Sequence, residues 1–174
     1  MLFGLLAGLV ATLLPEPVEA KHRITGLFGP ERTEDLKEAF KKVEGVRLVS
    51  VDFDASEAIL AYDPQKLSAR KQEKEILERL DALLGQASSH TFGVKPLSTT
   101  PREKLVRLEI PVLGLDCKAC ALAAYESIAK IDGVEQATAS FKEGLVTALI
   151  DPEKTTRAAL VEALKKRQVT LKAP

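Results

Sequence analysis

The sequence predicts an α+β protein built from two tandem units with the element order βαββαβ. Three observations carry this prediction: a repeat at a spacing of 88 residues, strands that alternate apolar and polar residues, and two amphipathic helices in each unit. When residues 24–66 are aligned with 112–154, ten of the 43 pairs are identical, against about three expected from average composition. The identities fall at turns and core positions, as two copies of one fold require.

The second copy shows the element order most clearly. Three stretches of alternating apolar and polar residues predict three strands, and a short fourth strand closes the unit near Leu171. The residues expected to face inward are Val106, Leu108 and Ile110, then Ala137, Ala139 and Phe141, then Val146, Ala148 and Ile150. Apolar residues at helical spacing predict a helix over 118–131 and a second one after a cap at Thr155 or Thr156.

The first copy follows the same order, with a longer second helix. The expected elements are a strand at 24–28, a helix at 33–44, strands with Val49, Val51 and Phe53 and with Ala58, Leu60 and Tyr62 inward, a helix at 68–84 and a closing segment at 90–97. Two helices on one face of a four-stranded antiparallel sheet make a ferredoxin-like sandwich. We therefore expect two tandem ferredoxin-like βαββαβ sandwiches with antiparallel four-stranded sheets.

The N-terminal segment differs from the rest of the chain. Residues 1–14 are apolar except for Thr12, and a Pro-Glu-Pro break with a Val-x-Ala end at Ala20 follows. This pattern is typical of a signal peptide, although no Lys or Arg precedes the run, and the run is shorter than the ~20 residues of a membrane-spanning helix. We expect 1–20 to be a signal peptide or an apolar segment that contacts the membrane during export, followed by domains at 21–97 and 104–174 and a linker at 98–103. The expected location is periplasmic or secreted, with cytoplasmic as the alternative.

Composition excludes several classes of function. Lys and Arg together number 25, as do Asp and Glu, so there is no basic excess of the kind that nucleic-acid binding requires. The sequence contains no nucleotide-binding loop, paired carboxylates or Ser/His/Asp arrangement, so we predict a protein that is not an enzyme. His22 and His90, the only histidines, are expected to be solvated.

The two cysteines carry the chemistry. Cys117 and Cys120 form Cys-Lys-Ala-Cys between the first strand and the first helix of the second copy. This spacing brings two sulfurs within reach of one metal ion or of each other. The positive end of the helix dipole stabilises thiolates, and thiolates prefer soft ions such as Cu(I) and Zn(II).

The segment Gly114-Leu115-Asp116-Cys117-Lys118-Ala119-Cys120 resembles the Gly-Met-x-Cys-x-x-Cys signature of the heavy-metal-associated domain family. The resemblance covers about 105–174, and it implies that Cys117 and Cys120 are the metal ligands. Leu115 stands where the family usually has Met, a loop-packing residue. Asp116 occupies a position where relatives that handle Zn(II), Cd(II) or Pb(II) often have Asp, so Asp116 is a possible third ligand.

The first copy lacks thiols at the equivalent positions. Gly29 and Arg32 replace Cys117 and Cys120 in the 88-residue register, which predicts a degenerate domain without the family's metal site. We therefore expect one soft metal ion per chain, Cu(I), Zn(II), Cd(II) or Hg(II). The resemblance implies a carrier, chaperone or detoxification protein that passes the ion to a metal-transporting ATPase or another metal acceptor.

Two other interpretations of the Cys-x-x-Cys motif remain open. It could serve thiol–disulfide exchange, as in thioredoxin-like proteins, or it could be vestigial in a structural or interaction module. The sequence also predicts that at least one of Lys165, Lys166 and Arg167 approaches the cysteines, because the loop after the second helix lies beside the metal loop in this fold.

Overall fold

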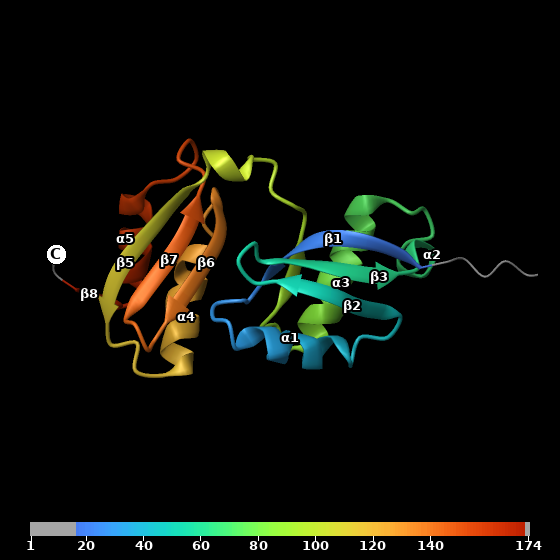
Figure 1. Cartoon of the computed structure of the whole chain (residues 1–174), viewed down its shortest axis with the longest axis horizontal. Coiled ribbons are helices and arrows are strands. Elements are labelled where there is room, and N and C mark those ends of the chain that lie inside the picture. Colours follow the sequence, from blue (N-terminus) through green and yellow to red (C-terminus); the bar gives the residue numbers. More distant parts are fainter. Residues whose placement is uncertain (1–16, 173–174) are drawn as a thin grey trace, which may run out of the picture.

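The computed structural model describes residues 17–172, which form two domains side by side along the long axis of the molecule (Figure 1). The first domain contains β1 (Val18–Thr25), α1 (Arg32–Phe40), β2 (Val46–Asp52), β3 (Glu57–Tyr62), α2 (Pro64–Leu67), α3 (Glu73–Ala87) and β4 (Gly93–Lys95). The second contains β5 (Val106–Leu113), α4 (Lys118–Ala129), β6 (Val134–Ser140), β7 (Leu145–Ile150), α5 (Arg157–Lys166) and β8 (Thr170–Leu171). A single 3-10 turn, η1 (Arg102–Lys104), lies in the segment between them.

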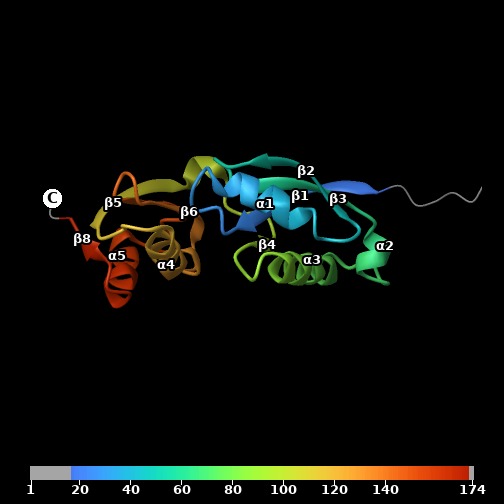
Figure 2. The same cartoon turned by 90° about the horizontal axis from the view of Figure 1, so that it is seen from below.

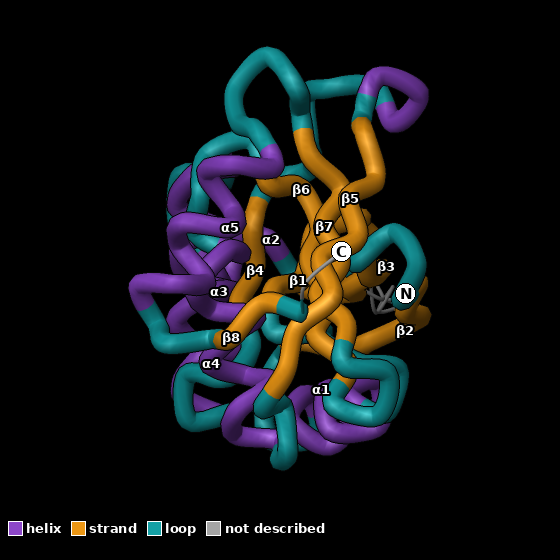
Figure 3. The backbone as a smooth tube through the Cα atoms, turned by 90° about the vertical axis from the view of Figure 1, so that its left-hand side faces the viewer, coloured by secondary structure: helices purple, strands orange, loops and turns teal. Residues whose placement is uncertain are grey.

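Both domains have the predicted α+β architecture. The strand orders are β2-β3-β1-β4 and β6-β7-β5-β8, and every recorded strand pair is antiparallel. Helices α3, α4 and α5 lie on the same side of the strands, which leaves the opposite sheet faces uncovered by these helices (Figures 2 and 3). Two tandem ferredoxin-like sandwiches are therefore present, as the sequence predicts.

The repeat is stricter in the structure than in the sequence. Strands β5, β6 and β7 each begin and end 88 residues after β1, β2 and β3, respectively. The prediction of a first strand at 24–28 is wrong, because β1 covers Val18–Thr25 and pairs with β3 along most of its length. Val18–Ala20 thus belong to the first sheet. The predicted signal peptide otherwise lies outside the described residues and stays a prediction.

The inward alternation predicted for the second strand is interrupted. The register of β2 against β3 shifts between Leu48 and Ser50, so Val49 is a bulged residue and is 38% exposed. The equivalent strand β6 has its own register shift between Val134 and Gln136. A bulge changes which side chains face the core downstream of it, and this cannot be read from alternation alone.

The helices of the first domain also depart from the prediction. The expected helix at 68–84 is replaced by the short α2 and by α3, which begins at Glu73. Asp63 caps α2 by accepting a hydrogen bond from the Gln65 backbone N–H. Lys71, with φ of +54°, departs from helical backbone geometry and so separates α2 from α3. Helix α1 ends at Phe40 and does not reach Glu44.

Each domain has its own apolar core between sheet and helices. The most buried large side chains include Leu36, Leu60, Leu80 and Leu84 in the first domain and Ile110, Ile128, Leu160 and Leu164 in the second. His22 lies in the first core at 7% exposure, and its Nε2 is 3.0 Å from the Tyr62 hydroxyl, so the prediction of a solvated His22 is wrong. His90 is exposed, as predicted. Within residues 17–172, no helix has both the length and the apolar character needed to cross a membrane.

Candidate functional site

The predicted metal loop connects β5 to α4 at one end of the second domain. It leaves the sheet after Leu113 and passes Gly114, whose φ of +75° lies in the left-handed region that favours glycine. Cys117 is the N-cap of α4, and its Sγ accepts a hydrogen bond from the backbone N–H of Cys120 at 3.2 Å. Cys117 therefore lies where the loop meets the helix, and Cys120 lies in the first helical turn.

The two thiols lie together at the helix N-terminus. Their sulfurs are 2.6 Å apart, both cysteines are free, Cys117 is exposed and Cys120 is half-buried. Two hydrogen bonds to its sulfur lower the pKa of Cys117; the larger effect comes from the Cys120 thiol and the smaller from the Cys120 backbone N–H. Donating that hydrogen bond raises the pKa of Cys120, and burial adds to the rise. The pair therefore loses its first proton from Cys117, which leaves a thiolate on the exposed side.

Neighbouring residues support the loop without completing a ligand cage. Leu115 is 4% exposed and packs in the core of the second domain, as expected for the loop-packing position. Asp116 is exposed, and its charge opposes ionisation of Cys117. Among the described residues, no group of three or more His, Cys, Asp or Glu side chains is placed to hold a metal ion. The structure thus brings Cys117 and Cys120 together as a pair, and Asp116 as a third ligand stays a prediction.

The approach of Lys165, Lys166 or Arg167 to the cysteines stays a prediction; the three residues lie at the end of α5. The Lys165 ammonium is 3.0 Å from a carboxylate oxygen of Glu162, one turn earlier in α5. Hydrogen bonding between the two cysteines has the largest effect on the pKa of both thiols, and the charge of Asp116 raises the pKa of Cys117.

The equivalent loop of the first domain, Gly26–Arg32, has a different role. Gly26 has φ of +92°, and a Cβ there would lie 2.2 Å from the Thr91 carbonyl oxygen, so only glycine fits. A Cβ at Gly29, the position equivalent to Cys117, would meet both Glu31 carboxylate oxygens at 2.7 Å. Arg32 stands at the position of Cys120, and its guanidinium carbon lies 5.0 Å from the ring centres of Phe28 and of Phe92.

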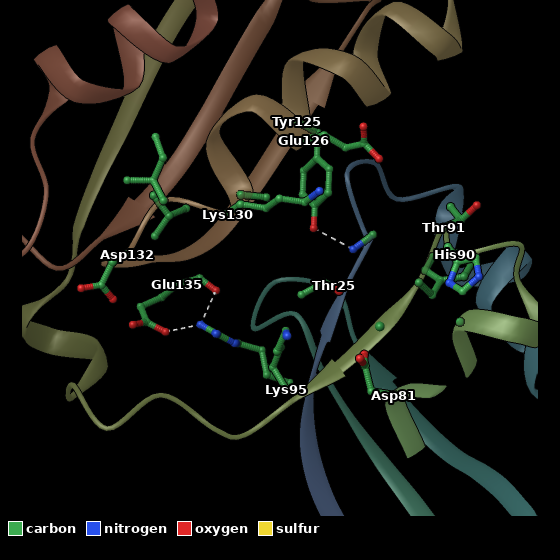
Figure 4. A pocket seen from close by; sticks show the side chains of 18 of the residues that line it. Thr25, Asp81, His90, Thr91, Lys95, Tyr125, Glu126, Lys130, Asp132 and Glu135 are labelled. Carbon is green, nitrogen blue, oxygen red and sulfur yellow. Dashed lines mark hydrogen bonds and ion pairs between the residues drawn. The ribbon is translucent and has the colours of Figure 1, made fainter. Parts of the chain in front are cut away.

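This cysteine-free loop packs against the second domain. Phe28 is 3% exposed and belongs to the apolar core of that domain, with its ring centre 5.8 Å from that of Tyr125 on α4. The Phe28 carbonyl accepts a hydrogen bond from the Ala139 N–H of the edge strand β6 at 2.9 Å. The Gly26 N–H donates to the Tyr125 hydroxyl at 2.7 Å, and Arg23 of β1 forms an ion pair with Glu135 (Figure 4).

These contacts were not foreseen from the sequence. The apolar spacing of the helix predicted over 118–131 does not reveal that the Tyr125 hydroxyl, on a core residue, accepts a hydrogen bond from the other domain. The strand predicted at 24–28 hid the role of Phe28, because Phe28 lies three residues beyond the end of β1. Consistent use of the 88-residue register would have placed Phe28 in the loop equivalent to the metal loop.

Known proteins are similar to this chain in sequence. The model of the family described as heavy-metal-associated domain matches residues 110–167. The mercuric transport protein periplasmic component of Shewanella putrefaciens is 35% identical over 72 residues, which cover 41% of this chain and 77% of that protein. Human copper-transporting ATPase 2 is 22% identical over 176 residues, which cover 83% of this chain but only 12% of the ATPase.

Solved structures give matches over both domains. The N-terminal soluble domains of Bacillus subtilis CopA match 92% of this chain and 95% of their own, with 21% identity and a TM-score of 0.37. The identity and coverage of the mercuric transport component, together with the family match over the Cys-x-x-Cys domain, place this sequence among its relatives. The chain belongs to the heavy-metal-associated domain family.

Proposed function

We propose that the protein binds one soft heavy-metal ion through the thiolates of Cys117 and Cys120 and carries it to an acceptor. The observation that carries the proposal is the placement of two free sulfurs 2.6 Å apart at the N-terminus of α4. Soft ions prefer thiolate ligands, and the unpaired N–H groups and dipole of a helix N-terminus favour the deprotonated form.

The ligand set favours ions of low coordination number. Zn(II) usually takes four ligands, whereas Cys117 and Cys120 supply two, and Asp116 is the nearest candidate for a third. Metal–thiolate bonds are about 2.3 Å long, so a linear two-coordinate ion needs sulfurs about 4.6 Å apart. The exposed Cys117 side chain has room to rotate outward and open the pair by this amount. We therefore rank Cu(I) and Hg(II) above Zn(II) and Cd(II) as cargo.

An exposed two-thiolate site also suits transfer. Incoming thiolates of an acceptor can reach the ion before Cys117 or Cys120 releases it, so the ion need not be set free. The partner is a metal-transporting ATPase or another metal acceptor, and the role is carriage or detoxification without catalysis. The similarity to a periplasmic mercuric transport component supports a periplasmic or secreted location.

Thiol–disulfide exchange is a second candidate function. It is favoured by the short distance between the sulfurs and by the lowered pKa of Cys117, the features of an attacking thiolate beside a resolving thiol. A dedicated redox protein would turn over disulfide substrates. We expect negligible insulin-reductase activity, and robust turnover that is lost in Cys117→Ser would favour the redox function.

A competition titration tests metal binding. The reduced protein is titrated with Cu(I), Hg(II), Zn(II) and Cd(II) against chromophoric chelators, alongside Cys117→Ser, Cys120→Ser and the double variant. We expect one tight equivalent per chain, which each single variant weakens at least about 100-fold, a loss of about 2.7 kcal/mol. Ala119→Ser is the matched control, because it adds a hydroxyl within the motif without removing a thiol. Two tight equivalents, or unchanged binding in the double variant, would refute the proposal.

A further inference from the structure

Helix α4 carries both the thiol pair and a contact with the first domain, at different positions along its length. Cys117 is its N-cap and Cys120 lies in its first turn, whereas Tyr125 lies about two turns from the N-cap. The Tyr125 hydroxyl accepts a hydrogen bond from the Gly26 N–H of the first domain. Tyr125 is 7% exposed and packs in the same apolar core as Leu115 of the metal loop. The thiol pair and the contact with the first domain therefore lie on one and the same helix.

The loop Gly26–Arg32 of the first domain contacts this helix. It is the loop equivalent to the one that carries the cysteines in the second domain. Arg32, in place of the second cysteine, lies between the rings of Phe28 and Phe92 and forms an ion pair with Asp35. Arg32 thus contacts the same Phe28 ring that enters the core of the second domain. The Phe28 carbonyl accepts a hydrogen bond from the edge strand β6, and the Phe28 ring packs beside Tyr125 of α4. The loop therefore contacts both α4 and β6, which pack against each other in the second domain.

Polar contacts around this loop extend the interface. Arg23 pairs with Glu135 and also donates to the Glu135 carbonyl at 3.3 Å, while the Gln136 side chain donates to the Phe53 carbonyl at 3.1 Å. In Figure 4, Tyr125 and Glu135 both point from the second domain toward β1 and the loop that follows it. The interface therefore combines a buried aromatic anchor with directed hydrogen bonds, which defines one orientation of the two domains.

We propose that docking of the cysteine-free domain and metal binding at Cys117 and Cys120 are energetically coupled through α4, with Tyr125 as the positioning residue. The proposal rests on the metal-binding function above. Docking orders α4 before the ion arrives, so less conformational entropy is lost when the two thiolates converge on it. Coupling between two binding events is reciprocal, so the bound ion must strengthen docking by the same factor.

Amide exchange provides a direct readout in the domain that has no thiols. The Gly26 N–H is bonded to Tyr125, so its hydrogen exchange reports undocking. We expect one equivalent of Cu(I), added to the reduced full-length chain, to slow Gly26 exchange at least about fivefold, the lower end of typical coupling. The Ser68 N–H, bonded to Pro64 in α2 at the far end of the first domain, should show little change.

Two pairs of variants test the reverse direction. Tyr125→Phe keeps the ring but removes the acceptor of the Gly26 N–H, and Arg23→Ala removes the ion pair with Glu135 outside the core. Each should weaken Cu(I) binding at least about fivefold. Their matched controls, Tyr62→Phe and Lys21→Ala, change the other tyrosine and a Lys21–Glu57 pair within the first domain, and should bind Cu(I) like the wild type.

The outcomes separate the coupling from the function on which it rests. A chain that binds no Cu(I), or a double cysteine variant that binds normally, would refute the metal-binding function. Normal binding by the wild type with unchanged Gly26 exchange, or with unchanged affinity in both interface variants, would refute the coupling alone.

Discussion

The loops Gly26–Arg32 and Gly114–Cys120 occupy equivalent places in two copies of one fold, yet they do different work. Both leave the first strand through a glycine in the left-handed region and both lead into the first helix. One places two thiols at a helix N-terminus, in a loop whose Asp116, Cys117, Lys118 and Ala119 are exposed. The other buries Phe28 in the neighbouring domain and stacks Arg32 between two aromatic rings. The same loop backbone therefore presents a thiol pair in one copy and contacts the neighbouring domain in the other.

The largest expected effect comes from removing the anchor of the docking loop. Phe28→Ala should lower the free energy of unfolding by about 3–5 kcal/mol, because it leaves a cavity in a packed core. The loss should appear in the second domain although Phe28 belongs to the first. Chemical denaturation monitored by domain-resolved hydrogen exchange measures this. Phe141→Ala, which truncates a ring that is 37% exposed, serves as the control, and an equal loss there would contradict a specific anchor.

A smaller loss is expected at the position equivalent to Cys120. Arg32→Ala removes a guanidinium that lies over two aromatic rings, which should cost about 1–2 kcal/mol of stability. Arg47→Ala, with a side chain 67% exposed, should change stability by less than about 0.5 kcal/mol. If both variants unfold at the same denaturant concentration, the stacking of Arg32 does not stabilise the docking loop.

The two domains should also differ in their response to acid. Burial lowers the pKa of His22 below its ordinary value of 6.5, although the charge of Glu73 works in the opposite direction. The unfolded chain then binds a proton more readily than the folded one, so stability should fall as pH drops below 6.5 toward the folded-state pKa. Hydrogen exchange of first-domain amides between pH 7 and 5 measures the loss. His22→Gln should flatten this pH dependence, and a matching effect of His90→Gln would contradict its assignment to His22.

The smallest expected effect concerns the metal loop itself. Asp116→Ala should weaken Zn(II) and Cd(II) binding by about three- to tenfold and leave Cu(I) binding nearly unchanged, because hard oxygen ligands contribute more to the less soft ions. Competition titrations of all three ions measure the ratio. Equal losses for all ions would assign Asp116 to the loop structure and not to the ligand set.

The amino-acid sequence by itself determined the architecture and the thiol pair. The 88-residue repeat, the alternation of apolar residues in the strands and the position of Cys117 and Cys120 before a helix are all local or periodic signals. They predicted the order of the elements and the place of the thiol pair correctly, although not every strand boundary or inward-facing residue. The degenerate character of Gly29 and Arg32 was equally visible, because it needs only the register of the repeat.

Tertiary structure alone decided what the cysteine-free copy contacts. Three features depend on which segments come together in space: the burial of His22, the bulge at Val49 and the insertion of Phe28 beside Tyr125. The residues next to them in the sequence do not indicate these contacts. An apolar residue in a loop can equally well complete its own domain or the next one. Only the packed arrangement shows that Phe28 fills the second core, because burial free energy depends on the surrounding surface and not on the sequence position.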